Sequence, residues 1–214
     1  MKKIIFTIFT ILTFFTSFSQ NGGEAKKILD EVSQKMSSYN NIFIDFDYVL
    51  DNKEEDVSQE LSGDVLLQGE KYMVNLFGST QIYDGKKTYT VMPENEEVNV
   101  SNADIDDKNL VTPSKFYSFY KSGYTFYMDK KKTIKGKKIQ FIKLVPIDSN
   151  SEVNSVLVGV DMGAKHIYQV IENGKNGTNT ILTAKKIKTD QDLDPNLFTF
   201  DKSKYEKMGY FIND

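Results

Sequence analysis

The chain has 214 residues, no cysteine, one histidine and a formal net charge of −3 at pH 7. The lack of cysteine excludes disulfides, thiolate metal sites and thiol nucleophiles, and a mildly acidic chain is not a typical nucleic-acid binder. All 27 basic residues are lysines, so arginine, the usual bidentate partner of phosphate and carboxylate groups, is also missing. We therefore expect a protein that is not an enzyme and that uses no metal or cofactor.

The first 19 residues have the layout of a cleavable secretory signal peptide. Two lysines precede an apolar run that is too short to span a membrane. Small residues, Ser17 and Ser19, occupy the −3 and −1 positions of a cut before Gln20, and no cysteine follows that could carry a lipid anchor. We expect residues 1–19 to be removed on export and residues 20–214 to form one periplasmic domain.

One amphipathic helix is predicted directly after the signal peptide. Apolar residues from Ala25 to Tyr39 recur at the spacing of a single helix face, and charged residues occupy the opposite face. Such a helix buries one stripe against the rest of the domain.

From Ile42 onward the apolar period changes to two, which indicates β-strands, beginning with Ile42–Leu50. Turn signals such as Asp84-Gly85 separate the strands that follow. The further predicted strands are Leu61–Gln68, Lys71–Phe77, Thr80–Tyr83, Thr88–Met92, Glu97–Val100, Tyr124–Asp129, Lys138–Val145, Val156–Asp161, Ile167–Glu172 and Thr180–Lys188. Short strands at this spacing favour a mostly β (α+β) domain with one antiparallel meander, either a barrel or a strongly curved sheet.

A second, shorter helix is predicted between the two groups of strands. Thr112-Pro113-Ser114 has the residues of a helix start, and Gly123 is a plausible stop. The segment between them carries four aromatic residues, including Phe116 and Phe119, and is too apolar to lie free in solvent. We expect it to fold over the sheet. The pattern leaves open whether side chains or an apolar ligand fill the concave face.

Several polar patterns have a structural interpretation beside the functional one. Ser118 and Lys121 match the Ser-x-x-Lys pattern of serine acyltransferases, but the companion motifs are missing. The acidic residues at 104–107 lack the glycine and glutamate of a calcium loop, and His166 is expected to be an ordinary strand residue. The lysines at 130–138 fit either a solvated edge that resists aggregation or a docking patch for an acidic partner.

Six short motifs follow the amphipathic helix in order. They are Phe46-Asp47-Tyr48, Leu61-Ser62-Gly63-Asp64-Val65, Lys71-Tyr72-Met73-Val74, Ile82-Tyr83-Asp84-Gly85-Lys86-Lys87-Thr88-Tyr89, Leu110-Val111-Thr112-Pro113 and Leu193-Asp194-Pro195-Asn196-Leu197-Phe198-Thr199-Phe200. Each is modest alone, but the ordered set resembles the periplasmic outer-membrane lipoprotein carrier family, LolA, across essentially the whole chain after the signal peptide.

The resemblance implies an unclosed β-barrel with helices as a lid over an apolar cavity, which takes the acyl chains of lipoproteins. It implies a periplasmic protein that receives cargo from an inner-membrane ABC exporter and delivers it to an outer-membrane acceptor. We also expect the protein to be a monomer. By position, the resemblance places seven residues near the cavity: Phe46, Tyr72, Val74, Leu76, Ile82, Tyr89 and Val91. It places Phe116 and Phe119 on the lid.

One stretch departs from the family pattern. The family carries an arginine just after its second strand that helps to hold the lid, whereas Leu67-Gln68-Gly69-Glu70 has no basic side chain there. Only aromatic packing is then left to close the lid, and we expect the inserted segment to open readily. The departure also leaves open a divergent, noncatalytic lipid-binding or envelope-assembly protein of the same fold.

Overall fold

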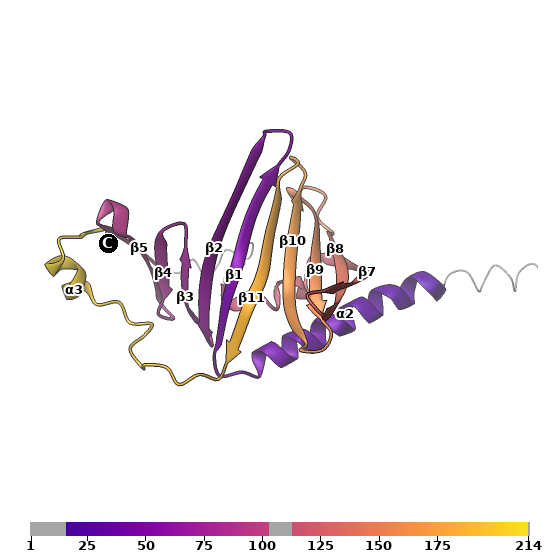
Figure 1. The fold of residues 1–214 in the computed structure, drawn as a ribbon, viewed down its shortest axis with the longest axis horizontal. Coiled ribbons are helices and arrows are strands. Elements are labelled where there is room, and N and C mark those ends of the chain that lie inside the picture. Colours follow the sequence, from indigo (N-terminus) through magenta and orange to yellow (C-terminus); the bar gives the residue numbers. More distant parts are fainter. Residues whose placement is uncertain (1–15, 103–112, 214) are drawn as a thin grey trace, which may run out of the picture.

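The computed structural model describes residues 16–102 and 113–213 (Figure 1). Most of the predicted signal peptide and the acidic residues at 104–107 lie outside this part of the chain.

One sheet of twelve strands makes up most of the described chain (Figure 1). Its strands are β1 (Ile42–Asn52), β2 (Val57–Gln68), β3 (Lys71–Leu76), β4 (Ser79–Tyr83), β5 (Lys87–Met92), β6 (Glu97–Asn102), β7 (Tyr124–Ile134), β8 (Lys137–Pro146), β9 (Val153–Asp161), β10 (His166–Gly174), β11 (Asn179–Thr189) and β12 (Phe211–Asn213). The helices are α2 (Thr16–Ser37) and α3 (Lys202–Lys207), with 3₁₀ turns η1 (Pro93–Asn95), η2 (Pro113–Lys115) and η3 (Phe119–Lys121). The predicted mostly β fold is confirmed.

The strand order explains why the sheet needs a long internal link. The order is β12-β6-β5-β4-β3-β2-β1-β11-β10-β9-β8-β7, and every pair is antiparallel except β12 with β6. The end strands β12 and β7 do not pair, so the barrel is unclosed, as predicted. Because β6 and β7 lie near opposite ends of the sheet, the chain between them has to cross from one end to the other.

A β-bulge marks the centre of the sheet, where β1 meets β11. The register shifts between Asp45 and Phe46, so that Asp45 pairs with Lys186 and Phe46 with Ala184. Lys185, the residue left over, places its Nζ 3.0 Å from a carboxylate oxygen of Asp45. A bulge bends the strand and increases its twist, which contributes to the curvature of the sheet.

The amphipathic helix α2 packs on β7 and β10 at one end of the sheet (Figure 1). Its apolar stripe is buried in the main core, as predicted from the spacing; its buried residues are Ala25, Ile28, Leu29, Val32 and Met36. Two polar contacts fasten the helix and its following turn to the β9–β10 end of the sheet. Lys165 donates to Glu31 at 2.9 Å, and the Tyr39 hydroxyl lies 2.9 Å from Nε2 of His166.

The inserted segment forms two 3₁₀ turns, η2 and η3, and not the single helix that was predicted. Its aromatic residues explain the difference, because they occupy both sides of the segment. Tyr120 is 1% exposed and points into the core, whereas Phe116 and Phe119 are half-buried and face the cavity described below. Successive contacts in different directions suit short 3₁₀ turns better than one amphipathic helix.

Tyr120 ties the inserted segment to α2. Its hydroxyl donates a 3.0 Å hydrogen bond to Oδ1 of Asp30, and Oδ2 of the same carboxylate accepts from Lys26 at 2.7 Å. The Tyr120 ring packs edge-on against Phe119 and Phe126. Burial raises the pKa of Tyr120, and the charge of Asp30 raises it further, so this phenol stays a donor.

We predict that Tyr120→Phe lowers the free energy of unfolding by about 1 kcal/mol, the usual net value of one hydrogen bond, because Asp30 is partly exposed and can bind water instead. Urea denaturation measures the change. Tyr127→Phe, on an exposed tyrosine of β7, is the matched control and should change stability little.

Acid should weaken the same anchor. Burial acts to raise the pKa of Asp30, but the hydrogen bonds from Lys26 and Tyr120 outweigh it and hold the pKa below its usual value. Its stabilising effect is therefore fully present above about pH 4 and is lost as the pH falls through the lowered pKa. A difference between wild type and Tyr120→Phe that grows on acidification would contradict this assignment.

Candidate functional site

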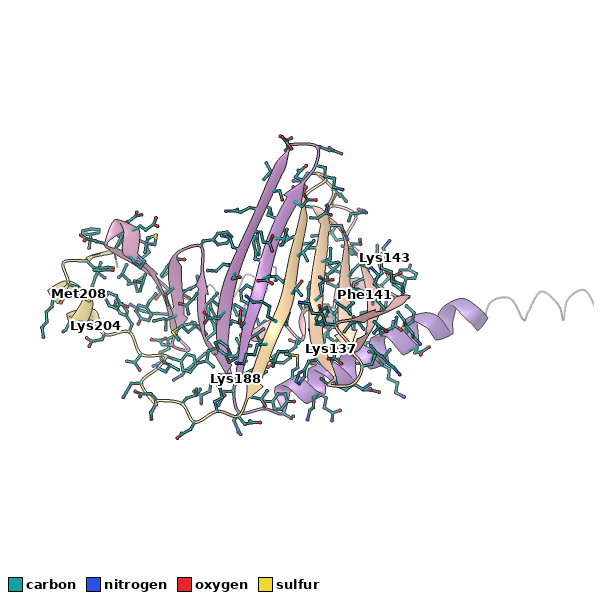
Figure 2. All side chains as sticks on the ribbon, viewed as in Figure 1. Lys137, Phe141, Lys143, Lys188, Lys204 and Met208 are labelled. Carbon is teal, nitrogen blue, oxygen red and sulfur yellow. The ribbon has the colours of Figure 1, made fainter. Side chains whose placement is uncertain are left out.

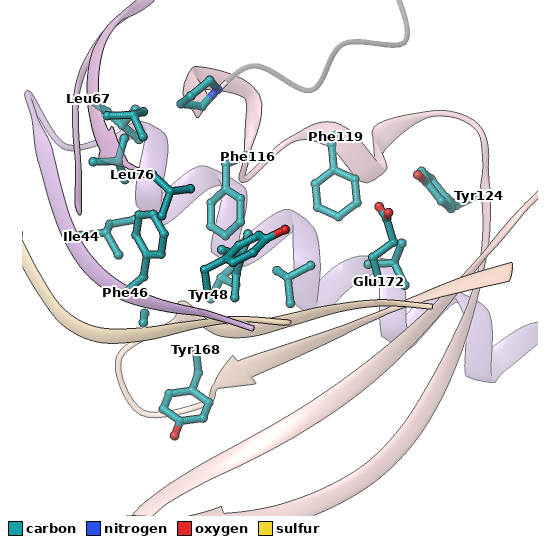
Figure 3. A pocket seen from close by; sticks show the side chains of 18 residues that line it. Ile44, Phe46, Tyr48, Leu67, Leu76, Phe116, Phe119, Tyr124, Tyr168 and Glu172 are labelled. Atoms are coloured by element: carbon teal, nitrogen blue, oxygen red, sulfur yellow. The ribbon is translucent and has the colours of Figure 1, made fainter. Parts of the chain in front are cut away.

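An apolar cavity of about 380 Å³ lies between the concave face of the sheet and the inserted segment (Figure 3). One wall comes from β1–β3, another from β9–β11, and the cover from the inserted segment and the start of β7. The lining residues are Ile44, Phe46, Tyr48, Val65, Leu67, Val74, Leu76, Pro113, Phe116, Phe119, Tyr124, Val156, Ile167, Tyr168, Val170, Glu172, Leu182 and Ala184.

The lining is apolar apart from a few atoms. Glu172 is its only charged residue, and Tyr48 and Tyr124 add hydroxyl groups. The ring of Tyr168 points away from the other lining side chains (Figure 3) and packs with a small cluster on the far face of the sheet. The volume falls within the roughly 300–1,000 Å³ of small-molecule sites, and the lining suits a hydrocarbon ligand.

Gly63 makes room for the aromatic wall of the cavity. It stands directly opposite Phe46 in the β1–β2 ladder, where the Phe46 ring lies over the bare backbone. A Cβ at this position would lie 2.6 Å from the carbonyl oxygen of Asn75, 2.9 Å from Leu76 Cδ1 and 3.0 Å from Phe46 Cζ. The glycine therefore lets Phe46 and Leu76 approach each other on the cavity wall.

The two residues that flank Gly63 face the outer side of the sheet. Ser62 donates to Asp47 at 2.8 Å, and Asp64 accepts from Asn75 at 2.9 Å. In the Leu61–Val65 motif, Gly63 thus faces inward and leaves room for the cavity wall, whereas Ser62 and Asp64 face outward and bond to neighbouring strands.

Five of the nine residues predicted for the cavity lie on its lining: Phe46, Val74, Leu76, Phe116 and Phe119. Tyr72 lies on the same face but is buried deeper, 6% exposed, in the core beside the cavity. The structure brings these six together.

Ile82, Tyr89 and Val91 do not line the cavity, because they lie on the outer face of the sheet. Ile82 pairs with Met73, the residue before the lining residue Val74, and Tyr89 pairs with Ile82. Since side chains alternate along a strand and paired residues share a face, both point away from Val74. The same pairing logic places Val91, which opposes Thr80, on the outer face.

The C-terminal segment covers this outer face. The Phe200 ring stacks on Tyr89 with centroids 4.5 Å apart, and Tyr205 stacks on Phe200 at 5.2 Å. Tyr89 also donates to Asp84 at 3.1 Å. The aromatic residue after the Asp-Gly-Lys hairpin therefore holds the C-terminal segment in place.

Sequence reasoning missed the second wall of the cavity. It comes from β9–β11 and includes Val156, Ile167, Val170 and Leu182. These residues belong to correctly predicted strands, and the pairs Tyr48–Leu182 and Val170–Leu182 show that they share the face of the β1 residues. The period of two in these strands indicates which residues share a face, but the sequence alone does not reveal that β1 pairs with β11.

The place of the missing family arginine lies next to the inserted segment. The β2–β3 turn contains Gly69, at a φ of 59°, followed by Glu70. Burial raises the pKa of Tyr117 on the inserted segment, and the charge of Glu70 raises it further. An acidic residue therefore lies near the cover where the family has a basic one, and the Tyr120–Asp30 hydrogen bond ties the cover down elsewhere.

Residues from three of the other polar patterns make local contacts. The Ser118 hydroxyl donates to the carbonyl of Lys115 within the turn, and His166 contacts Tyr39. Lys137, at the start of β8 (Figure 2), lies 3.5 Å from Asp161. In the part of the chain that the structure describes, no group of histidine, cysteine and carboxylate side chains could hold a metal ion.

The fold and the cavity together define an unclosed barrel with a covered apolar site. A family model for the outer membrane lipoprotein carrier protein LolA matches residues 15–182, so the chain belongs to this family, as the resemblance indicated; the motif at Leu193–Phe200 lies beyond the match. A search for curated proteins similar to the sequence finds no match. Within residues 16–102 and 113–213, no helix has the length and hydrophobicity needed to cross a membrane.

Several solved structures are similar to this chain at low sequence identity, and the first of the three below shares its fold. An uncharacterized conserved protein from Thermus thermophilus is 9% identical, with a TM-score of 0.58 over 88% of this chain and 98% of that one. A LolA superfamily protein from Nitrosomonas europaea is 13% identical, with a TM-score of 0.42 over 83% and 98%. The lipoprotein LppX from Mycobacterium tuberculosis is 12% identical, with a TM-score of 0.46 over 79% and 98%.

We predict that Gly63→Ala destabilises the protein by about 1–3 kcal/mol, the range for overpacking a filled site. The added methyl group meets backbone on one side and must displace Phe46 or Leu76 on the other. Thermal unfolding measures the loss. Gly163→Ala is the control, because a Cβ there has only Asp161 near it, at 3.4 Å. Equal melting temperatures for the two variants would contradict this role of Gly63.

Proposed function

We propose that this protein is a noncatalytic periplasmic carrier that binds the acyl chains of lipoproteins in the cavity and takes them from the inner to the outer membrane. The observation that carries the proposal is the covered cavity, whose lining contains one charged residue among 18. Each buried methylene stabilises a bound chain by about 0.8 kcal/mol, so an acyl anchor does not cross water unescorted. A carrier needs such a site and no catalytic group.

The inserted segment supports reversible access to the cavity. Phe116 and Phe119 are only half-buried and contribute rings to the lining, whereas Tyr120 is fully buried and bonded to α2. In our proposal the segment pivots about Tyr120, and the two phenylalanines move aside to admit a chain. Packing of partly exposed rings costs little to undo, so opening is easier than unfolding a strand.

The family membership is the support for the partners. In our proposal an inner-membrane ABC exporter supplies the acylated cargo, and an outer-membrane acceptor removes it. Glu70, in the turn where the family carries an arginine, favours a different means of release from that of the arginine-bearing carriers.

We predict that Leu76→Asp weakens binding of a fluorescent acyl probe at least tenfold, because a carboxylate in an apolar cavity loses its hydration without gaining a partner. Fluorescence titration measures the affinity. Ile147→Asp makes a similar change at a side chain that is 69% exposed and outside the lining, so it should bind like wild type. A wild-type protein that binds no acyl probe would sink the proposal.

Export and cleavage before Gln20 form a separate proposal, supported by the N-terminal pattern. Helix α2 begins at Thr16, and the described part of its buried stripe runs from Ala25 to Met36, downstream of the predicted cut. We predict that the exported protein begins at Gln20. Intact-mass measurement of protein from the periplasmic fraction tests this, and a retained or lipidated N-terminus would contradict it.

A further inference from the structure

Glu172 gives the apolar cavity a negatively charged end. It lies on β10, pairs with Val156 of the lining, and is exposed although it borders the cavity. Figure 3 shows it beside Tyr124, at the opposite end of the cavity from Leu67. Burial raises the pKa of Tyr124 and the charge of Glu172 raises it further, which agrees with their closeness.

No residue of the lining carries a positive charge. The polar end of an acyl ligand stays out of the apolar interior, because burying it without partners costs several kcal/mol. It therefore lies at the wet end of the site, where the described lining offers a carboxylate and the hydroxyl of Tyr124. A carboxylate accepts hydrogen bonds from N–H groups strongly and repels another anion.

We propose that Glu172 selects acyl chains whose polar end donates N–H hydrogen bonds, such as a chain joined to a peptide through an amide, over chains that end in a free carboxylate or phosphate. This inference rests on the proposed acyl-binding function and names the class of ligand for that cavity. It also gives the protein a reason to leave free fatty acids aside, although their hydrocarbon chains would fit the same lining.

The test uses two fluorescent ligands of equal chain length, dansyl-labelled undecanoate and its N-methylamide. We expect wild type to bind the amide about tenfold more tightly than the carboxylate at low salt, with a smaller ratio at high salt. In Glu172→Gln the ratio should fall to about one, and in Glu172→Lys the carboxylate should bind more tightly. Glu60→Gln is the matched control. Glu60 is exposed on β2 and pairs with Val49, which follows the inward-facing Tyr48 on β1, so Glu60 points away from the cavity.

The outcomes separate this inference from the proposed function. If neither ligand binds wild type, both the acyl-binding function and the selectivity are overturned. If both ligands bind with a ratio near one, or if Glu172→Gln and Glu60→Gln change the ratio alike, the selectivity is overturned and acyl binding stands. A thermal melt of each variant shows that it is folded, as expected for substitutions at exposed positions.

Discussion

A curved sheet that does not close has an apolar inner face that must be kept from water. In this molecule α2 covers the end formed by β7 and β10, and the segment between β6 and β7 has to cross from one end of the sheet to the other. These two covers leave a space of about 380 Å³ that no side chain fills. The cavity is thus a consequence of strand order: the same link that makes the topology possible brings Phe116 and Phe119 over the site.

The cavity needs matched small and large residues on its walls. Because Gly63 has no side chain, Phe46 and Leu76 can approach each other. The flanking Ser62 and Asp64 lie on the outer face, where they hydrogen-bond to residues of neighbouring strands. The cover has a comparable division of roles. Tyr120 fixes it to Asp30 of α2, while Phe116 and Phe119 face the cavity. This hydrogen bond connects the cover to α2 although the chain lacks the family arginine.

Local patterns in the sequence predicted most of the elements, because period and turn residues are local signals. The buried stripe of α2 and the runs of β1–β11 follow directly from spacing. The outer ends of β1 and β2 were missed because residues 51–60 are largely polar and exposed, and only the hairpin ladder makes them strands. The two 3₁₀ turns were missed because aromatic residues in several directions do not distinguish a helix from successive turns.

The cavity was harder to predict than the fold, because it depends on which strands pair and which face each strand presents. Ile82 and Tyr89 were expected on the lining, but neighbouring residues of a strand point to opposite faces, and the observed register places both on the outer face. There Tyr89 meets the C-terminal segment. The β9–β11 wall follows only from the β1–β11 pairing, which joins residues far apart in the sequence. Nothing in the sequence distinguishes Glu172 from the other acidic residues, and only the pairing of the strands places it at the end of the cavity.

Native mass spectrometry of the protein, purified without detergent from the cells in which it is naturally made, tests the central claim most directly. The account predicts a population heavier than the bare chain by the mass of an acylated molecule, which organic extraction removes and which Leu76→Asp lacks. A bare chain in every preparation, or an adduct that Leu76→Asp retains in full, would contradict the claim that this cavity carries acyl chains.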